Sequence, residues 1–440
     1  MQSDTISSNA ISESPDFIEI RRIVPVHAGA GVITRIKRYA GVGFLIAVGY
    51  MDPGNWATDI EAGSRFGYNL IGVVFLSGLI AMLMQTLCVR LGVASGKDLA
   101  QLCRERFPAK VNKTLWVLAQ TAIIACDFAE VLGTALAIKL LFGLPLTVGI
   151  LIAGCDIFIL LYLQGKNMLR IEHIVLLLVM VISVAFAAEI VFSKPDWSKV
   201  ASGFLPSAET WKSPQAWYIA IGILGATVMP HNLYLHSYAV RSREVKQGLT
   251  AKTDTIRLLI LDTIITLGLA CFVNASILLV TASAFHFTGH SDIVEIQDAY
   301  RMLSPVLGAA MASGIFALAL FASGQSSTLT GTLAGQVIMR GFLNLRIPAW
   351  KQRFYTRMMA VLPAWICIAI MGEGSVGKLL VFSQVVLSMQ LPFAIIPLLL
   401  FNTDRSIVGN WAMSGMLRTV SWCTGLGIAA ANLFLIASVL

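Results

Sequence analysis

Charged residues are scarce in this chain of 440 residues. Asp, Glu, Lys and Arg make up 13% of it and hydrophobic residues 57%, whereas ordinary soluble domains are about 25% charged. A soluble protein of this length divides into about two or three domains, each of which needs a polar surface. Thirty-two basic and 24 acidic side chains are too few to cover such surfaces, so the composition excludes a soluble enzyme.

Several enzyme motifs are also missing. The sequence contains neither HExxH nor GxSxG, and Gly96-Lys97 is followed by Asp98 without the upstream glycine of a P-loop. Seven cysteines form no CxxC pair, so neither a disulfide framework nor a cysteine metal site is predicted. Residues 1–38 lack the pattern of a signal peptide and are predicted to be a cytoplasmic tail. These absences disfavour a membrane-embedded enzyme and an ATP-driven pump.

Long apolar runs dominate the chain instead. A helix that spans a bilayer needs about 20 predominantly apolar residues, and short polar links separate eleven such runs in this sequence. The runs are 40–63, 69–94, 114–141, 146–163, 172–192, 215–239, 257–285, 306–338, 358–372, 376–401 and 415–438. The sequence therefore predicts an all-α, multi-pass membrane protein with eleven transmembrane helices.

The basic residues are divided unevenly between the two sets of links. With the N-terminus in the cytoplasm, the cytoplasmic side holds 25 of the 32 Lys and Arg residues, among them those of the link around 340–357, which includes Arg353 and Arg357. Cytoplasmic loops carry an excess of Lys and Arg, so we predict a cytoplasmic N-terminus and an extracytoplasmic C-terminus in the cell (inner) membrane. The net charge of +8 therefore reflects orientation, and no nucleic-acid partner is predicted.

Two of the predicted spans are interrupted near their middle. The run DPGN at 52–55 interrupts the span 40–63, and MPH at 229–231 interrupts the span 215–239. Because they lie five spans apart, the two broken spans enter the membrane from opposite sides, which is typical of inverted-repeat secondary transporters. Proline kinks are common in membrane helices, and such a kink would explain one break. It is a weaker explanation for two breaks that each lie beside a potential cation ligand.

This reasoning predicts a domain organisation built on two halves. The predicted units are a tail at 1–38, a five-helix repeat at 39–193, an extracytoplasmic link at 194–213, an inverted five-helix repeat at 214–402 and an eleventh helix at 403–440.

The residues at the breaks predict a metal site. Proline cannot donate to the carbonyl four residues earlier, which frees the carbonyls of Gly49 and Ala226, and such helix ends favour cations. Asp52 offers a carboxylate, Asn55 an amide oxygen on the same helical face, and Met229 a thioether. Hard Mg²⁺ and Ca²⁺ gain little from sulfur, whereas later first-row divalent ions accept it. The pattern therefore favours a transition metal.

Acidic residues inside the spans predict a proton pathway. A buried Asp52 is costly unless it is paired, protonated or bound to a cation, so metal arrival favours its carboxylate and metal departure its protonation. Asp127 and Glu130 share one helical face, and His231 and His236 follow the second break. We predict that these five side chains move protons, although His236 taken alone is more typical of a structural helix histidine.

Five segments of the sequence resemble those of a known family. The segments GYMDPGNWATDIEAG, DFAEVLGTA, GATVMPHNLYLHS, ASGQSSTLTGTLAGQ and FSQVVLSMQLPFA are similar to those of the NRAMP family of proton-coupled divalent metal transporters. The resemblance covers essentially residues 40–438 and is closest in type to the bacterial manganese importers. It implies a fold similar to that of the sodium/amino-acid symporters, with two inverted five-helix repeats plus one helix.

The resemblance also implies roles for single residues. Asp52, Asn55, Met229 and the carbonyl of Ala226 are expected to bind Mn²⁺ or Fe²⁺. The Gly49 carbonyl is expected to join them in one conformation, and glycine there departs from the family's usual alanine.

Further positions match the family. Gln384 matches a glutamine that approaches the metal, and Asp127, Glu130 and His231 match positions implicated in proton movement. Asp59 and Glu61 are expected either to enrich cations in the outer vestibule or to be ordinary polar residues of a helix face.

Two other functions stay open at this stage. An organic-solute symporter, for example for amino acids, could use the same scaffold, but it would not need an acid and a thioether beside its substrate carboxylate. A metal sensor that does not transport is the second. The expected partners are divalent metal ions, protons and the bilayer. Neither a resident cofactor nor an obligate protein partner is predicted.

Overall fold

The computed structural model describes residues 41–164, 168–205, 208, 210–242, 249–289, 295–307, 312–345 and 347–439. Within these ranges the chain is helical and contains no strand. The all-α prediction is thereby confirmed for the described residues. The predicted tail at 1–38 lies outside them.

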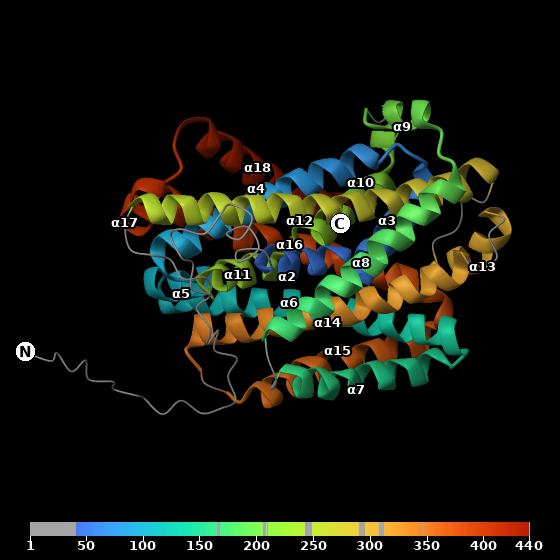
Figure 1. Ribbon diagram of the computed structural model, residues 1–440, viewed down its shortest axis with the longest axis horizontal. Helices are drawn as coiled ribbons and strands as arrows, with labels where there is room; N and C mark the ends of the chain where they lie inside the picture. Colours follow the sequence, from blue (N-terminus) through green and yellow to red (C-terminus); the bar gives the residue numbers. More distant parts are fainter. Residues whose placement is uncertain are drawn as a thin grey trace, which may run out of the picture.

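The helices pack into an elongated bundle whose long members run mostly along its long axis (Figure 1). The main α-helices are α2 (Val42–Ala47), α3 (Pro53–Phe66), α4 (Ile71–Ser95), α5 (Leu99–Arg106), α6 (Ala109–Phe142), α7 (Leu146–Gln164), α8 (Met168–Ser193), α9 (Trp197–Gly203), α10 (Pro214–Val228), α11 (Pro230–Ala239), α12 (Leu249–Ala284), α13 (Ile296–Leu307), α14 (Ala312–Leu343), α15 (Ala349–Met371), α16 (Val376–Thr403), α17 (Arg405–Val408) and α18 (Gly415–Val439). A 3₁₀ turn, η1 (Val48–Met51), continues α2.

Many of these helices suit a bilayer. In the described part of the chain, seven helical stretches are long and apolar enough to cross one: Ile71–Ser95, Ala109–Phe142, Pro214–Ala239, Ala251–Thr288, Trp350–Met371, Glu373–Thr403 and Gly415–Ala437. Three shorter apolar helices cover Val42–Met51, Leu146–Cys155 and Val179–Ser193. All ten overlap predicted spans. The total of eleven crossings stays a prediction.

One predicted boundary needs correction, and another can be compared only in part. The run 306–338 includes residues 308–311, which lie outside the described ranges, and from Ala312 onward it belongs to α14, which continues to Leu343. The run 358–372 begins earlier, because α15 starts at Ala349 and contains Arg353 and Arg357. Both arginines were assigned to a cytoplasmic link from sequence, yet they are 2% and 1% exposed. They are interior groups and carry no information on orientation.

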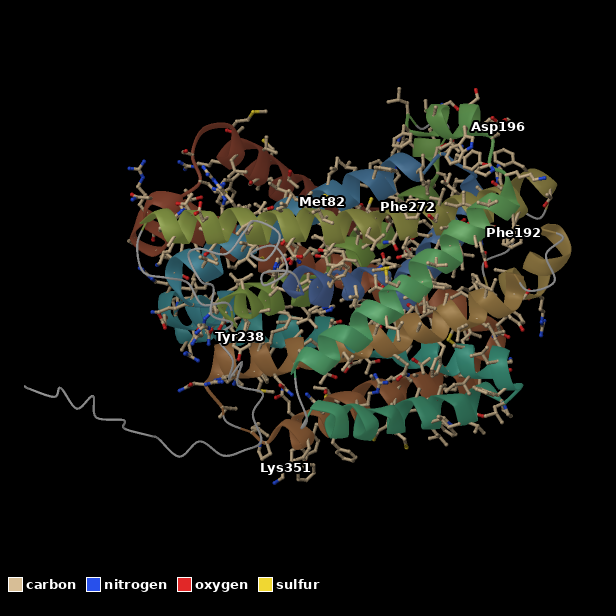
Figure 2. The ribbon with its side chains drawn as sticks, viewed as in Figure 1. Met82, Phe192, Asp196, Tyr238, Phe272 and Lys351 are labelled. Carbon is tan, nitrogen blue, oxygen red and sulfur yellow. The ribbon has the colours of Figure 1, made fainter. Side chains whose placement is uncertain are left out.

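The ends of the bundle differ from its middle. In Figure 1, α5 and α17 lie toward one end, and α9 and α13 toward the other. Asp196 lies near the end formed by α9, whereas the half-exposed apolar side chain of Phe272 lies farther toward the middle (Figure 2). An apolar middle between more polar ends is the expected form of a membrane-embedded bundle.

The two interrupted helices lie inside the bundle. Helix α3 packs against α12, α10, α16 and α6, and α11 packs against α14, α4 and α16. In Figure 1 this central group is flanked by α4 and α12 on one side and by α7 and α15 on the other. Polar groups at the breaks are therefore enclosed by protein, the setting in which irregular backbone is tolerated at membrane depth.

Candidate metal site at two broken helices

The first break falls at Asp52. Helix α2 and its 3₁₀ extension end at Met51, Asp52 is extended at φ −71° and ψ 163°, and α3 begins at Pro53. Proline suits a first helical position because the backbone N–H that it lacks would have no partner there. The Asp52 carboxylate accepts from the backbone N–H groups of Asn55 at 3.0 Å and Gly54 at 3.2 Å. Asp52 is therefore held as the N-cap of α3.

The second break falls at Met229, where α10 ends and Pro230 begins α11. Met229 has φ 35°, a left-handed conformation that is uncommon for residues other than glycine. Such conformations cluster at functional sites, where the surrounding structure enforces them. Both predicted breaks are thus present.

Asn55 joins the two breaks. Its Nδ2 donates to Asp52 Oδ1 at 2.6 Å and to the carbonyl oxygen of Ala226 at 3.0 Å, across 171 positions of sequence. Its Oδ1 accepts from Asn274 of α12 at 3.2 Å. A carboxylate and a carbonyl from opposite breaks therefore converge on one point, which suits a group that carries positive charge.

Gln384 reaches the same place from α16. A Cβ built on Gly54 would lie 1.9 Å from Gln384 Nε2 and 2.8 Å from Asp52 Oδ2, so glycine at 54 is what admits the glutamine. Gln384 Nε2 donates to Ser383 at 2.9 Å. The structure thus brings Gln384 beside Asp52.

Met229 and Gly49 are connected through a residue that the sequence analysis did not single out. Asn232 Nδ2 donates to the Met229 sulfur at 3.5 Å, and it lies 2.5 Å from the position of a Cβ built on Gly49. The six predicted metal ligands therefore form two contact groups at the breaks. One group joins Asp52, Asn55, Ala226 and Gln384, and the other joins Met229 and Gly49 through Asn232.

Several buried hydrogen-bond acceptors in and beside this region lack a donor. Among the described residues, Gln384 Oε1, Asn232 Oδ1, Asn274 Oδ1 and Thr227 Oγ1 are buried without a hydrogen-bond partner. The donors to Asp52 given above are all neutral amides. Buried acceptors without donors are costly, and a cation relieves that cost. The described residues contain no cluster of three His, Cys, Asp or Glu side chains able to hold a metal, so amide, carbonyl and thioether donors would have to contribute.

Apart from Asp52, which lies at the first break, the predicted proton residues divide into two groups. In the first, Cys126 links α6 to α11, with its Sγ 3.4 Å from Glu130 Oε1 and 3.6 Å from His231 Nε2. Asp127 and Glu130 both face Gly331 of α14. Arg357 Nη1 lies 3.7 Å from Glu130 Oε2. Arg357 Nη2 donates to the Ala153 carbonyl at 2.8 Å.

His236 belongs to the second group. Its Nδ1 lies 2.8 Å from Gln85 Oε1, and Gln85 Nε2 donates to the Tyr50 hydroxyl at 2.5 Å. These three buried side chains connect α11, α4 and η1. The structure therefore places His236 in a hydrogen-bonded network separate from that of Glu130 and His231.

The two acids expected in the vestibule differ from each other. Asp59 is 1% exposed, and its Oδ2 has no hydrogen-bond partner among the described residues. Glu61 pairs with Arg65 at 3.0 Å and accepts from Gln215 at 3.3 Å. Glu61 therefore has conventional partners, whereas Asp59 Oδ2 has none in the described part of the chain.

Sequence reasoning missed Cys126, Gln85, Asn232, Asn274 and Arg357 as members of these networks. Each is a polar or ionisable residue within a mostly apolar helix, which is a usable signal in membrane proteins. Their partners lie on other helices, so only the fold identifies the contacts.

The fold and the site define an integral membrane protein with an enclosed polar centre at two broken helices. The model of the Nramp family, described as natural resistance-associated macrophage protein-like, matches residues 43–438. The chain belongs to the Nramp family, and the resemblance predicted from the sequence is confirmed. A relative from Nostoc sp., named divalent metal cation transporter MntH, is 49% identical over 422 residues, which are 96% of this chain and 96% of that protein.

Solved structures agree with this assignment. The crystal structure of the Eremococcus coleocola manganese transporter is 36% identical, with a TM-score of 0.88, and the match covers 96% of this chain and 91% of that chain. MhsT, solved in complex with L-phenylalanine, is 14% identical with a TM-score of 0.61, over 89% of this chain and 98% of that chain. The second likeness shows a shared fold alone.

Proposed function

We propose that this protein is a proton-coupled symporter that imports divalent transition metal ions, Mn²⁺ and Fe²⁺ in particular, across the cell membrane. The observation that carries the proposal is the convergence of the Asp52 carboxylate and the Ala226 carbonyl on one point, 2.6 Å and 3.0 Å from the same nitrogen. The names of the Nostoc and Eremococcus relatives, which refer to divalent metal cations and manganese, support the class of substrate.

The proposed architecture is eleven crossings in two inverted five-helix repeats plus one helix. The repeats are residues 39–193 and 214–402, joined by the link 194–213, with the last helix in 403–440. The breaks at Asp52 and Met229 occupy corresponding places in the two halves, and the fold shared with MhsT supports this layout. The excess of basic residues on one side supports a cytoplasmic N-terminus and an extracytoplasmic C-terminus.

Metal binding requires one local rearrangement. Asn55 Nδ2 occupies the point where the acceptors converge, so the amide must withdraw from it before a cation can meet both oxygens, and a turn of the amide presents Oδ1 to that cation. The turn breaks the hydrogen bond that Asn274 Nδ2 donates to Asn55 Oδ1, while Asn274 Nδ2 keeps the Tyr50 carbonyl as its acceptor. Asp52, Asn55, the Ala226 carbonyl and Met229 then provide three oxygen ligands and one sulfur, with Gly49 and Gln384 as further donors. This mixed set favours later first-row ions over Ca²⁺ and Mg²⁺.

The proposed proton coupling follows from the free-energy cost of a buried carboxylate inside the membrane. Asp52 has neutral donors only in its described hydrogen bonds, and an isolated carboxylate at this depth is expensive. Metal binding supplies the missing positive charge and displaces any proton held there. Glu130, linked to His231 through Cys126 and paired with Arg357, is proposed to receive protons, with Asp127 beside it. His236 is proposed to join the pathway only through its separate network.

An organic-solute symporter is the alternative on this scaffold. A substrate carboxylate would need N–H donors, but the buried groups without partners here are mostly oxygen acceptors. The likeness to MhsT concerns the fold alone, so it does not favour this alternative. The Nostoc and Eremococcus relatives are named as transporters, which favours a transporter over an enzyme.

The test is uptake by purified protein in liposomes that contain a pH-sensitive dye. We expect saturable Mn²⁺ uptake, acidification of the lumen that depends on Mn²⁺, and little uptake of Ca²⁺. Labelled amino acids in parallel liposomes test the alternative. Robust amino-acid uptake without Mn²⁺ uptake would refute metal transport, and Mn²⁺ uptake at constant internal pH would refute proton coupling.

A further inference from the structure

Asn232 touches both halves of the candidate metal site. It stands in the first turn of α11, fully buried, and its Nδ2 donates to the Met229 sulfur at 3.5 Å. The same nitrogen lies 2.5 Å from where a Cβ on Gly49 would stand, and Asn232 Cγ and Oδ1 lie 3.3 Å from that point. One side chain therefore contacts the sulfur of the second break and the backbone of the first.

The hydrogen bond to sulfur affects how Met229 can bind. Methionine has a flexible side chain with three rotatable bonds, and its sulfur is polarizable. A thioether sulfur has two lone pairs, so an N–H on one of them restrains the side chain and leaves the other for a cation. Ordering a ligand before binding improves affinity because less conformational entropy is lost. That gain is largest for ions whose binding depends on sulfur.

Gly49 is the second half of this arrangement. Real Cβ atoms essentially never approach another heavy atom within 3.0 Å, so an alanine at 49 would displace the Asn232 amide. The amide is enclosed, with its Oδ1 buried and without a partner among the described residues. A displaced Asn232 would therefore lose its bond to Met229.

On the basis of the metal transport proposed above, we infer that Asn232 positions the Met229 sulfur and thereby sets the preference for soft over hard divalent ions, and that glycine at 49 admits it. The contact makes Gly49 and Asn232 a coupled pair. Each change to either residue should act through the orientation of one sulfur atom.

The experiment measures binding of Cd²⁺, which favours sulfur, and of Mn²⁺, which favours oxygen, to the full-length purified protein by isothermal titration calorimetry. We expect Asn232→Ala to weaken Cd²⁺ binding about tenfold and Mn²⁺ binding less than about threefold. Gly49→Ala should shift the Cd²⁺:Mn²⁺ affinity ratio in the same direction. In the Asn232→Ala background, however, Gly49→Ala should change that ratio by less than about twofold, because coupled residues are not additive.

An unchanged ratio in Asn232→Ala, or an equal effect of Gly49→Ala in both backgrounds, would overturn the inference. If Gly49→Ala alone elutes as aggregate, recovery of a monodisperse peak in the double variant supports the pairing, and failure to recover overturns it. Gly427 on α18 has open space around it, so Gly427→Ala is the matched control and should leave both affinities unchanged. A shift in the ratio for that control also overturns the inference.

Failure of the proposed function has a different signature. If wild-type protein binds neither ion, or if Asp52→Ala binds both as wild type does, metal transport through this site is wrong whatever Asn232 does. If binding depends on Asp52 but the ratio does not respond to Asn232, only the inference about Asn232 is wrong.

Discussion

The side-chain nitrogen of Asn55 donates to the carbonyl oxygen of Ala226 at 3.0 Å, and this bond crosses from the first broken helix to the second. The same nitrogen donates to Asp52 at 2.6 Å. The amide thus takes the position in which a cation would meet both acceptors. A metal and this hydrogen bond compete for the same oxygens, so metal affinity at the site depends on how readily the Asn55 amide turns.

Asp52 is the strongest single test of the site. Asp52→Ala removes the one carboxylate at the breaks and also the N-cap of α3, and losing an N-cap costs about 1 kcal/mol. We expect saturable Mn²⁺ uptake into proteoliposomes to fall by about a hundredfold or more, because the remaining ligands of the site are neutral. Asp298→Ala, at a half-exposed aspartate on α13, is the matched control and should keep uptake. Near-normal uptake by Asp52→Ala would sink the assignment.

Met229 is expected to govern selectivity more than rate. Met229→Ala removes the sulfur and leaves the oxygen ligands, so Mn²⁺ uptake should fall less than in Asp52→Ala. Discrimination against Ca²⁺ should weaken about tenfold, which corresponds to about 1.4 kcal/mol. Competition of Ca²⁺ with labelled Mn²⁺ measures this, and Met416→Ala, at a strongly exposed methionine, is the control. An unchanged inhibition constant for Ca²⁺ would show that sulfur is not the selectivity filter.

The sequence predicted the breaks because proline acts on the backbone locally. Pro53 and Pro230 each lack the N–H that would continue the preceding helix, and α2 with η1, and α10, end just before them. Proline alone does not decide a break, since Pro363 lies inside α15 and Pro392 inside α16. The neighbouring residues Asp52 and Met229 were therefore placed correctly at the breaks. Their partners were not visible in the sequence, since Asn274 and Asn232 are defined by contacts between helices.

Arg353 and Arg357 show the opposite case. Charges beside an apolar run resemble a polar link, so the span predicted from the sequence begins only at residue 358. In the structure both lie within α15, and Arg357 is paired with Glu130 of α6. A buried ion pair depends on a partner far away in the sequence, and hydropathy alone cannot distinguish it from a loop charge.

Glu130 is expected to affect proton movement more than metal binding. Its described contacts are with Cys126 and Arg357, not with the ligands at the breaks. Glu130→Gln keeps the shape of the side chain but removes its charge and its ability to carry a proton. Mn²⁺-driven acidification of the lumen should fall several-fold while Mn²⁺ affinity changes less than about threefold. Glu105→Gln, at a surface pair with Lys97, is the control. Acidification equal to that of wild type would exclude Glu130 from the pathway.

Gly54 offers a steric test of Gln384. An alanine at 54 would place its Cβ 1.9 Å from Gln384 Nε2 and 2.8 Å from Asp52 Oδ2, so both side chains would have to move. We expect Gly54→Ala to reduce Mn²⁺ uptake at least about tenfold, since catalytic and binding groups tolerate shifts of only about 0.5 Å. Gly314→Ala on α14, where nothing lies within 4 Å, should have no such effect. Shortening Gln384 to alanine in the Gly54→Ala protein removes the closer clash, and partial recovery of uptake is expected. If uptake is equally low in the single and the double variant, the clash with Gln384 is not the reason for the loss. Displacement of Asp52 alone would then explain it.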